Sequence, residues 1–153
     1  MTAVSRSTRV DAPAARTWEV LSDLPSMGER SPENTGGRWA GGATGPAVGA
    51  RFEGSNQRGR HRWSTVATVV RCEPGAQLAF EVSSLGLAVA EWSYVVSPDG
   101  PGACTVTETW TDRRGALMRA VGPLVTGVRD REAFTATSIE QTLAAVKARA
   151  EQG

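Results

Sequence analysis

The stretch CTVTETWTDRR, residues 104–114, alternates strictly between two kinds of side chain. Four threonines occupy the odd positions 105–111, whereas the even positions are Cys104, Val106, Glu108 and Trp110. Strict alternation predicts a strand with one buried and one solvent face, and threonine suits the solvent face because it is β-branched and polar. Glu108 is therefore expected to point inward, where an unpaired carboxylate is costly to ionise.

Four more strand patterns precede this stretch and are separated by turn signals. The patterns lie at 51–57, 61–73, 77–82 and 87–96, and the turns between them contain RGR, PG, SSLG and SPDGPG. Short strands joined in series by tight turns predict an antiparallel meander.

The segments before the meander predict an edge strand and short helices. Residues 3–10 alternate as an edge strand, and 11–24 change to a helical period, followed by at most one further helical turn before Pro32. Residues 35–52 are glycine-rich with a strand around Arg38–Trp39, and they contain neither a G-x-G-x-x-G motif after a strand nor a G-K-[ST] ending. A nucleotide-binding loop is therefore not expected.

The chain returns to a helical period after the meander. We expect a short helix near 116–121 and a long helix from about Val128 to Ala150, with Ile139, Leu143 and Val146 on its apolar stripe. A curved antiparallel sheet of about six or seven strands cannot bury its concave face on itself. The long helix is the element able to cover it, in an α+β fold with a pocket between sheet and helix.

Length and composition limit the class of protein. A chain of 153 residues predicts one domain, 1–153, and a net charge of +1 predicts no nucleic-acid partner. The absence of a long apolar run and of a signal pattern predicts no membrane span and a cytoplasmic location.

Metal and disulfide chemistry are not expected either. His61 is the single histidine, and the two cysteines lack paired spacing, so neither a metal nor another cofactor is predicted. Cys72 and Cys104 fall on strands separated by two others, at ~4.8 Å per strand, too far apart for a disulfide bond.

Four stretches carry a resemblance to a known family: VDAPAARTWEVLSDL, GPAVGARFEGSNQRG, VVRCEPGAQLAFEV and the closing TVTETW with its helix. Together they resemble the SRPBCC or START-like superfamily, in particular its polyketide cyclase/dehydrase and lipid-transport branch. The resemblance covers nearly the whole chain and implies the helix-grip fold. It transfers no catalytic residue, because the matching residues are structural.

Strand alternation supplies the candidate ligand-binding residues. It places Trp63, Trp92, Tyr94 and Trp110 on the concave wall together with Asn56. The first half of the long helix adds polar and aromatic residues that a sealed core does not require: Arg131, Phe134 and Thr135, followed by Ser138. Two interpretations remain open, plain core packing of the rings or the wall of an aromatic, partly polar cavity.

Glu108 also has two interpretations. It can be a structural carboxylate paired with an arginine such as Arg131. Alternatively, it can be a desolvated carboxyl with a raised pKa that serves as a catalytic acid or base or as a ligand anchor, assisted by Tyr94. His61 falls in a turn at the expected mouth of the cavity, where a lone histidine is generally solvated.

Arginines concentrate in two loops at the same expected mouth. Arg58, Arg60 and Arg62 lie in one loop, and Arg113 and Arg114 in another. They form either a solubilising edge or a surface that attracts an anionic ligand or an acidic carrier protein.

These observations predict a protein that binds a hydrophobic, polycyclic or polyketide-like small molecule. Its catalytic form would cyclise, dehydrate or isomerise that molecule by cofactor-independent acid–base chemistry. The alternatives are a non-catalytic lipid or hydrophobic-ligand carrier and a co-chaperone-like interaction module.

Overall fold

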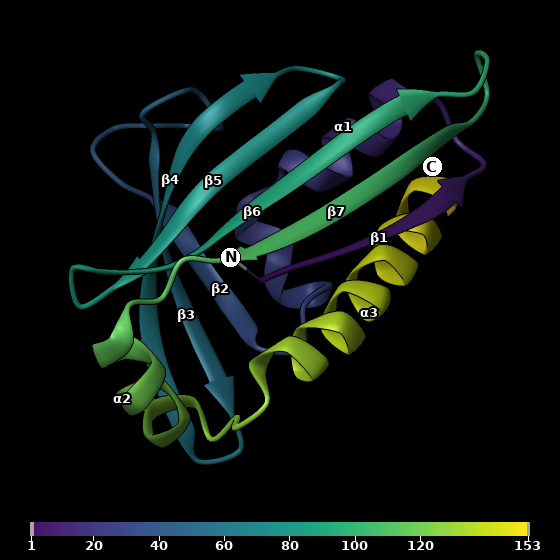
Figure 1. The fold of residues 1–153 in the computed structure, drawn as a ribbon. Helices are drawn as coiled ribbons and strands as arrows, with labels where there is room; N and C mark the ends of the chain where they lie inside the picture. The colour runs from purple at the N-terminus through teal and green to yellow at the C-terminus, as the bar shows by residue number, and fades with distance from the viewer. Residues whose placement is uncertain (1, 153) are drawn as a thin grey trace.

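The computed structural model describes residues 2–152, which form seven strands, three α-helices and one 3₁₀ helix (Figure 1). The strands are β1 (Ala3–Val10), β2 (Asn34–Trp39), β3 (Arg51–Arg58), β4 (His61–Glu73), β5 (Gln77–Ser84), β6 (Leu87–Pro98) and β7 (Cys104–Asp112). The helices are α1 (Ala14–Ser22), the 3₁₀ helix η1 (Leu24–Glu29), α2 (Ala116–Thr126) and α3 (Arg131–Gln152).

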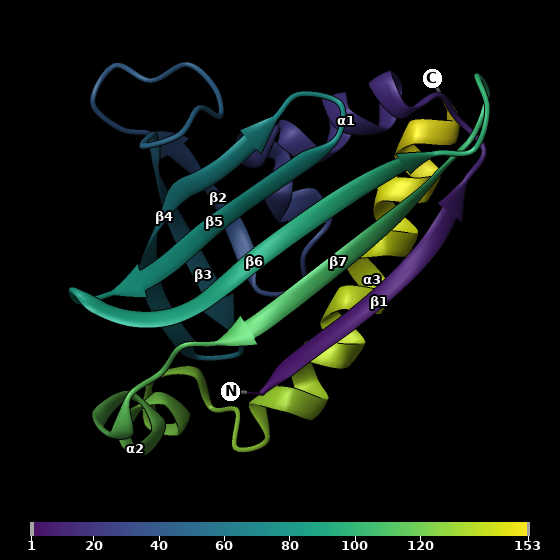
Figure 2. The ribbon, with the colours of Figure 1, turned by 45° about the horizontal axis from the view of Figure 1, so that its top comes forward.

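The seven strands form one antiparallel sheet in the order β1-β7-β6-β5-β4-β3-β2. The segment β2 to β7 is a meander, and β1 pairs with β7 at the end of the series. Figures 1 and 2 show α1 and α3 on the same face of the sheet, with α3 running alongside β1 and β7. The predicted α+β helix-grip architecture is confirmed.

Alternation along β7 is realised as predicted. In β7, Cys104, Val106, Glu108 and Trp110 are buried, whereas the threonines between them are half-exposed. The run VATVVRC in β4 is apolar on both faces, and here the register shifts between Val69 and Arg71. This β-bulge leaves Val70 exposed while Val69 stays buried.

One end of the sheet is filled by a solid core. Ile139, Leu143 and Val146 of α3 are almost completely buried in one cluster with Leu78 of β5 and Val106 of β7. Burying side chains of this size contributes about 1.5–3 kcal/mol each. This cluster fixes where α3 lies across the sheet.

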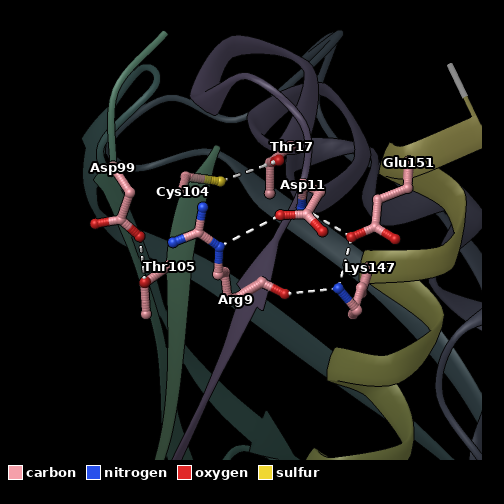
Figure 3. Close-up of polar contacts among 8 residues, drawn as sticks. All are labelled: Arg9, Asp11, Thr17, Asp99, Cys104, Thr105, Lys147 and Glu151. Atoms are coloured by element: carbon pink, nitrogen blue, oxygen red, sulfur yellow. Dashed lines mark hydrogen bonds and ion pairs between the residues drawn. The ribbon is translucent and has the colours of Figure 1, made fainter. Parts of the chain in front are cut away.

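Polar contacts hold the C-terminal end of α3 to the end of β1 and the β1–α1 connection (Figure 3). Lys147 Nζ donates to the carbonyl oxygen of Arg9 at 3.0 Å, and the Asp11 amide donates to the Glu151 carboxylate at 2.8 Å. Lys147 and Glu151 also pair with each other at 2.6 Å. In the same view, the thiol of Cys104 faces the Thr17 hydroxyl at 3.3 Å; Cys104 and Cys72 are both free.

The helices after β7 differ from prediction in their bounds. The short helix was expected near 116–121, but α2 continues through Gly122 and Pro123 to Thr126. Proline removes one amide donor without preventing the residues after it from being helical. Gly127 then ends the helix in the left-handed conformation (φ 76°), with its amide bonded to the Pro123 carbonyl oxygen at 2.9 Å. The long helix begins at Arg131 rather than Val128.

Candidate functional site: a pocket between the sheet and the helices

A pocket of about 170 Å³ lies between the concave face of the sheet and the helices. Aromatic side chains dominate its sheet side: Phe52, Trp63, Phe80, Trp92, Tyr94 and Trp110. All six belong to inward positions of β3 to β7, and Trp63, Trp92, Tyr94 and Trp110 are the rings that alternation placed on the concave wall. They do not fill the space beneath the helices completely.

The pocket begins where the solid core ends, and Glu108 lies at the boundary. Along β7, Cys104 and Val106 belong to the core, whereas Glu108 and Trp110 line the pocket. The same change occurs on the neighbouring strand β6, where Tyr94 pairs with Glu108 in register. The floor of the pocket is therefore buried and carries a carboxyl group.

Glu108 and Tyr94 form a hydrogen-bonded pair in this floor. The Tyr94 hydroxyl donates to Oε2 of Glu108 at 2.7 Å, and only 1% of the Glu108 surface is exposed. The other oxygen, Oε1, is buried and has no hydrogen-bond partner among residues 2–152. Glu108 also belongs to the pocket lining.

The electrostatics of the pair follow from burial. Desolvation raises the pKa of Glu108 to about 8, although the Tyr94 hydrogen bond and the positive charge of Arg30 act in the opposite direction. Desolvation, followed by the Glu108 charge, raises the pKa of Tyr94 well above its ordinary value. At neutral pH Glu108 is mainly a neutral carboxylic acid, which can donate a proton as well as accept a hydrogen bond.

The arginine proposed as a partner of Glu108 pairs elsewhere. Arg131 donates from Nη1 to Oε1 of Glu33 at 2.8 Å and from Nη2 to Oε2 at 3.4 Å. Arg131 is the first residue of α3, so its side chain reaches the segment before β2 rather than the middle of β7. The alternative of an Arg131–Glu108 ion pair was therefore wrong, although Arg131 and Glu33 both line the pocket.

The first half of α3 supplies a row of hydroxyl groups opposite the aromatic wall. Thr135, Ser138 and Thr142 line the pocket from one face of the helix. Across the pocket, the Asn56 side-chain amide donates to the Thr65 hydroxyl at 3.1 Å, and both residues belong to the lining. Asn56 and Thr135 thus lie where alternation and helical period placed them, whereas Thr142 was missed.

Phe134, also predicted to bind ligand, does not belong to the pocket lining. Its ring instead contacts two guanidinium groups, with Arg58 at 5.4 Å and Arg131 at 5.2 Å from its centre. The half-buried ring thus makes cation–π contacts near the start of α3.

The arginines assigned to the mouth separate into different environments. Arg114 lines the pocket and is bound by Asp112, whereas Arg113 pairs with Glu91 at 2.9 Å. Arg58 donates to the carbonyl oxygen of Gly127 at 3.4 Å. Arg60 and Arg62 are exposed, and neither forms an ion pair with any residue in the range 2–152.

Helix α2 closes the end of the pocket opposite the solid core. Met118, Gly122 and Val125 line the pocket from one face of α2, yet every residue of this helix keeps part of its surface exposed. Leu24 and Met27 of η1 also belong to the lining. The sequence carried no signal for these contributions, because strand alternation says nothing about which helical residues meet the sheet.

Two negative findings apply to the described part of the chain. Within residues 2–152, no group of three or more His, Cys, Asp or Glu side chains is placed to hold a metal ion. None of the helices in that range combines the length and apolar character needed to cross a bilayer.

Residues 1–151 match the family model described as polyketide cyclase/dehydrase and lipid transport. The chain belongs to this family. A search of the curated proteins found no significant match.

Solved structures of the same fold come from several bacteria. A polyketide cyclase-like protein from Corynebacterium glutamicum is 25% identical, with a TM-score of 0.65 over 95% of this chain and 88% of that one. A START superfamily protein from Mycobacterium smegmatis is 16% identical (TM-score 0.74, 98% and 97% covered). The Zhui aromatase/cyclase from a Streptomyces species is 17% identical (TM-score 0.64, 99% and 94% covered). The superfamily inferred from sequence is confirmed.

Proposed function

We propose that the protein binds a hydrophobic, polycyclic or polyketide-like small molecule in the pocket and acts on it through Glu108 and Tyr94. The observation that carries this proposal is that Glu108 lines the pocket while its buried Oε1 has no partner within residues 2–152. A buried polar atom without a partner is costly, and a ligand group that bonds to it removes that cost. Membership of a polyketide cyclase/dehydrase family supports the choice of ligand class.

The shape of the pocket supports an aromatic ligand. A cavity of about 150 Å³ lined by apolar side chains is known to hold benzene, and this pocket measures about 170 Å³. It therefore accommodates one aromatic ring between the tryptophans and the hydroxyl row of α3. A polycyclic ligand would extend toward α2, the wall with the least buried surface.

The proposed chemistry is proton transfer by Glu108. In a dehydration, its carboxyl group gives the proton on Oε1 to a hydroxyl group of the ligand, which leaves as water. The resulting carboxylate takes a proton from the adjacent carbon, so that a double bond forms and the acid is restored. Tyr94 keeps Oε2 hydrogen-bonded throughout and so orients Oε1 toward the ligand.

A second candidate is a non-catalytic carrier of lipid-like molecules. It is favoured by the small number of free titratable groups: of the charged lining residues, Glu33 pairs with Arg131 and Arg114 with Asp112. In a carrier, Glu108 would anchor a polar group of the ligand without exchanging a proton with carbon. The two candidates share the pocket and differ in whether the bound molecule is changed.

The test uses ligand binding and turnover by wild type, Glu108→Gln and Glu81→Gln. Glu81 is exposed on β5, so it controls for loss of a glutamate from the sheet. We expect hydroxylated anthraquinones to quench tryptophan fluorescence saturably, and Glu108→Gln to weaken this binding by about tenfold. Glu81→Gln should bind like wild type.

Turnover separates the enzyme from the carrier. With a β-hydroxy ketone of a reduced polyketide, loss of water that requires Glu108 would support catalysis. Saturable binding without turnover would support the carrier, and equal binding by Glu108→Gln and wild type would refute both roles of Glu108.

A further inference from the structure

The end of the molecule at α2 carries exposed apolar side chains on two separate elements. Leu85, in the turn between β5 and β6, is 91% exposed, and Leu117 and Leu124 of α2 are 62% and 78% exposed. Figures 1 and 2 show this turn and α2 at the same end of the sheet. We call three segments together the rim. They are residues 57–62 around the β3–β4 turn, Leu85 and Gly86 of the β5–β6 turn, and residues 112–130, which contain α2.

Helix α2 is apolar on both of its faces. Met118, Gly122 and Val125 face the pocket, whereas Leu117, Val121 and Leu124 form a stripe on the outer side, three or four residues apart. Apolar helix faces are normally buried, yet the stripe of Leu117, Val121 and Leu124 is exposed. The outer stripe is suited to contact an apolar environment outside the protein.

The turn at Leu85 departs from local conformational preference. Among residues 2–152, Leu85 is the only residue other than glycine with a positive φ, at 54°, and Gly86 follows with φ 76°. Hairpin turns with two such residues prefer asparagine, aspartate or glycine at the first position. Leucine at this position therefore strains the backbone and also exposes an apolar side chain to water. Such a combination indicates that Leu85 contacts another molecule rather than stabilising the fold.

The rim is rich in arginine. Residues 57–62 contain three arginines and no acid, and residues 112–130 contain four arginines and two aspartates. The rim thus holds seven of the 17 basic residues but two of the 16 acidic ones. Because the chain as a whole has a net charge of only +1, the positive charge is concentrated at this end.

We propose that the rim docks on the surface of an anionic phospholipid bilayer, with Leu85, Leu117 and Leu124 inserted among the lipids and the arginines against the phosphates. Leucines on two separate protruding elements suit a bilayer, which deforms around each of them, better than a protein partner, which would need a matching pocket for each. Apolar insertion combined with attraction of arginines to anionic lipid is sufficient for reversible membrane binding.

This docking would place the pocket next to the bilayer. The inserted face and the pocket wall are the two faces of α2, so a displacement of this helix into the lipid would connect the pocket with the membrane interior. A poorly water-soluble ligand could then enter without crossing water. The docking itself does not depend on the ligand or on catalysis at Glu108.

The experiment is flotation of the full chain with vesicles of phosphatidylcholine containing about 30 mol% phosphatidylglycerol. We expect wild type to bind these vesicles at about 0.1 M salt, to bind far less at about 0.5 M, and not to bind pure phosphatidylcholine. Leu85→Asn and Leu124→Ser should each weaken binding by about tenfold. Arg60→Glu combined with Arg62→Glu should weaken it at least as much and reduce its salt dependence.

Two features of these variants separate docking from folding. Asparagine tolerates the left-handed conformation, so Leu85→Asn should melt at or above the wild-type temperature while binding less. Val48→Ser is the matched control, because Val48 is 68% exposed in the β2–β3 loop at the opposite end of the sheet. It should bind like wild type.

Failure of wild type to bind the anionic vesicles, or equal binding by Leu85→Asn and wild type, would overturn the proposal. So would binding of the rim to an acidic acyl carrier protein that Leu85→Asn abolishes, if vesicles are not bound. In that case the occupant of the rim is a protein.

Discussion

Two carboxylates on the same face of β7 lie in opposite electrostatic environments. Glu108 is in the pocket floor with a tyrosine as its partner, whereas Asp112, four residues later, receives Nε and Nη2 of Arg114 at 3.0 and 2.9 Å. Arg119 of α2 also approaches Asp112 at 3.7 Å. Both carboxylates are buried, at 1% and 4% exposure, so burial alone does not decide how a carboxylate behaves.

The difference separates a reactive region from an anchoring one. Burial raises the pKa of Glu108 to about 8. Burial acts in the same direction at Asp112, but the hydrogen bonds and charge of Arg114, with the charge of Arg119, outweigh it and hold the pKa below its ordinary value. Glu108 is thus an uncompensated acid that faces the pocket, and Asp112 ties the start of α2 to the end of the sheet.

The largest expected effect is the pH dependence caused by Glu108. Its pKa is higher in the folded than in the unfolded state, so its contribution is most favourable below pH 4.5 and is lost as pH rises toward 8. Wild type should lose about 5 kcal/mol of unfolding free energy across this range relative to Glu108→Gln. Urea unfolding of both proteins at a series of pH values measures this difference. If the unfolding free energies of the two proteins changed in parallel with pH, the pKa of Glu108 would not be raised and Glu108 would be ionised in the folded protein at neutral pH.

Asp112→Asn should have the next largest effect, with the opposite dependence on pH. The substitution leaves Arg114 without its carboxylate and should lower the unfolding free energy at pH 7 by about 1–3 kcal/mol. Because the pKa of Asp112 is depressed, its contribution is present above pH 3.8 and is lost as pH falls through the folded-state pKa. The difference between variant and wild type should therefore shrink in acid. A difference that stays constant down to low pH would contradict this assignment.

The smallest effect concerns the other end of α2. A Cβ at Gly127 would lie 2.9 Å from Cε1 of His61 and 3.2 Å from Nη1 of Arg58, in a backbone with φ 76°. Gly127→Ala should speed hydrogen exchange of α2 amides by about tenfold, equivalent to about 1–2 kcal/mol of local strain, without affecting β7.

Gly100→Ala is the matched control for this prediction. Gly100 has a φ of 91° and no atom within 4 Å of its added Cβ, so it carries the backbone strain without the contact. If Gly127→Ala left the exchange rates of the α2 amides unchanged, the contacts of Asp112 with Arg114 and Arg119 at the start of the helix would be sufficient to position α2.

Much of the fold and the aromatic wall of the site could be predicted from sequence, because both depend on strand alternation. The face that carries Trp63, Trp92, Tyr94 and Trp110 follows from parity and short turns, since side chains on a strand have a period of two. The inward position of Glu108 follows by the same rule. The bulge at Val70 could not be predicted, because a run that is apolar on both faces gives no register.

Helical contributions to the site were predicted less well. The polar start of α3 was visible as Thr135 and Ser138, but Phe134 was placed in the pocket although its ring lies outside it. A helix turns its side chains by 100° per residue, so a small error in its rotation exchanges inner and outer positions. The lining residues of η1 and α2 have no sequence pattern of their own that relates them to the sheet.

The sequence by itself determined that Glu108 is buried, and the tertiary structure decided what accompanies it. Alternation is a local property of the backbone and specifies a face, whereas the partner of a buried carboxylate depends on elements far away in the chain. Arg131 pairs with Glu33, 98 positions away in the chain, and Arg114 pairs with Asp112 at the end of β7. Glu108 is therefore left with a neutral partner, the hydroxyl group of Tyr94. Desolvation is then not offset by a paired cation, and for this physical reason the same residue type is an anchor at one end of β7 and a candidate acid in its middle.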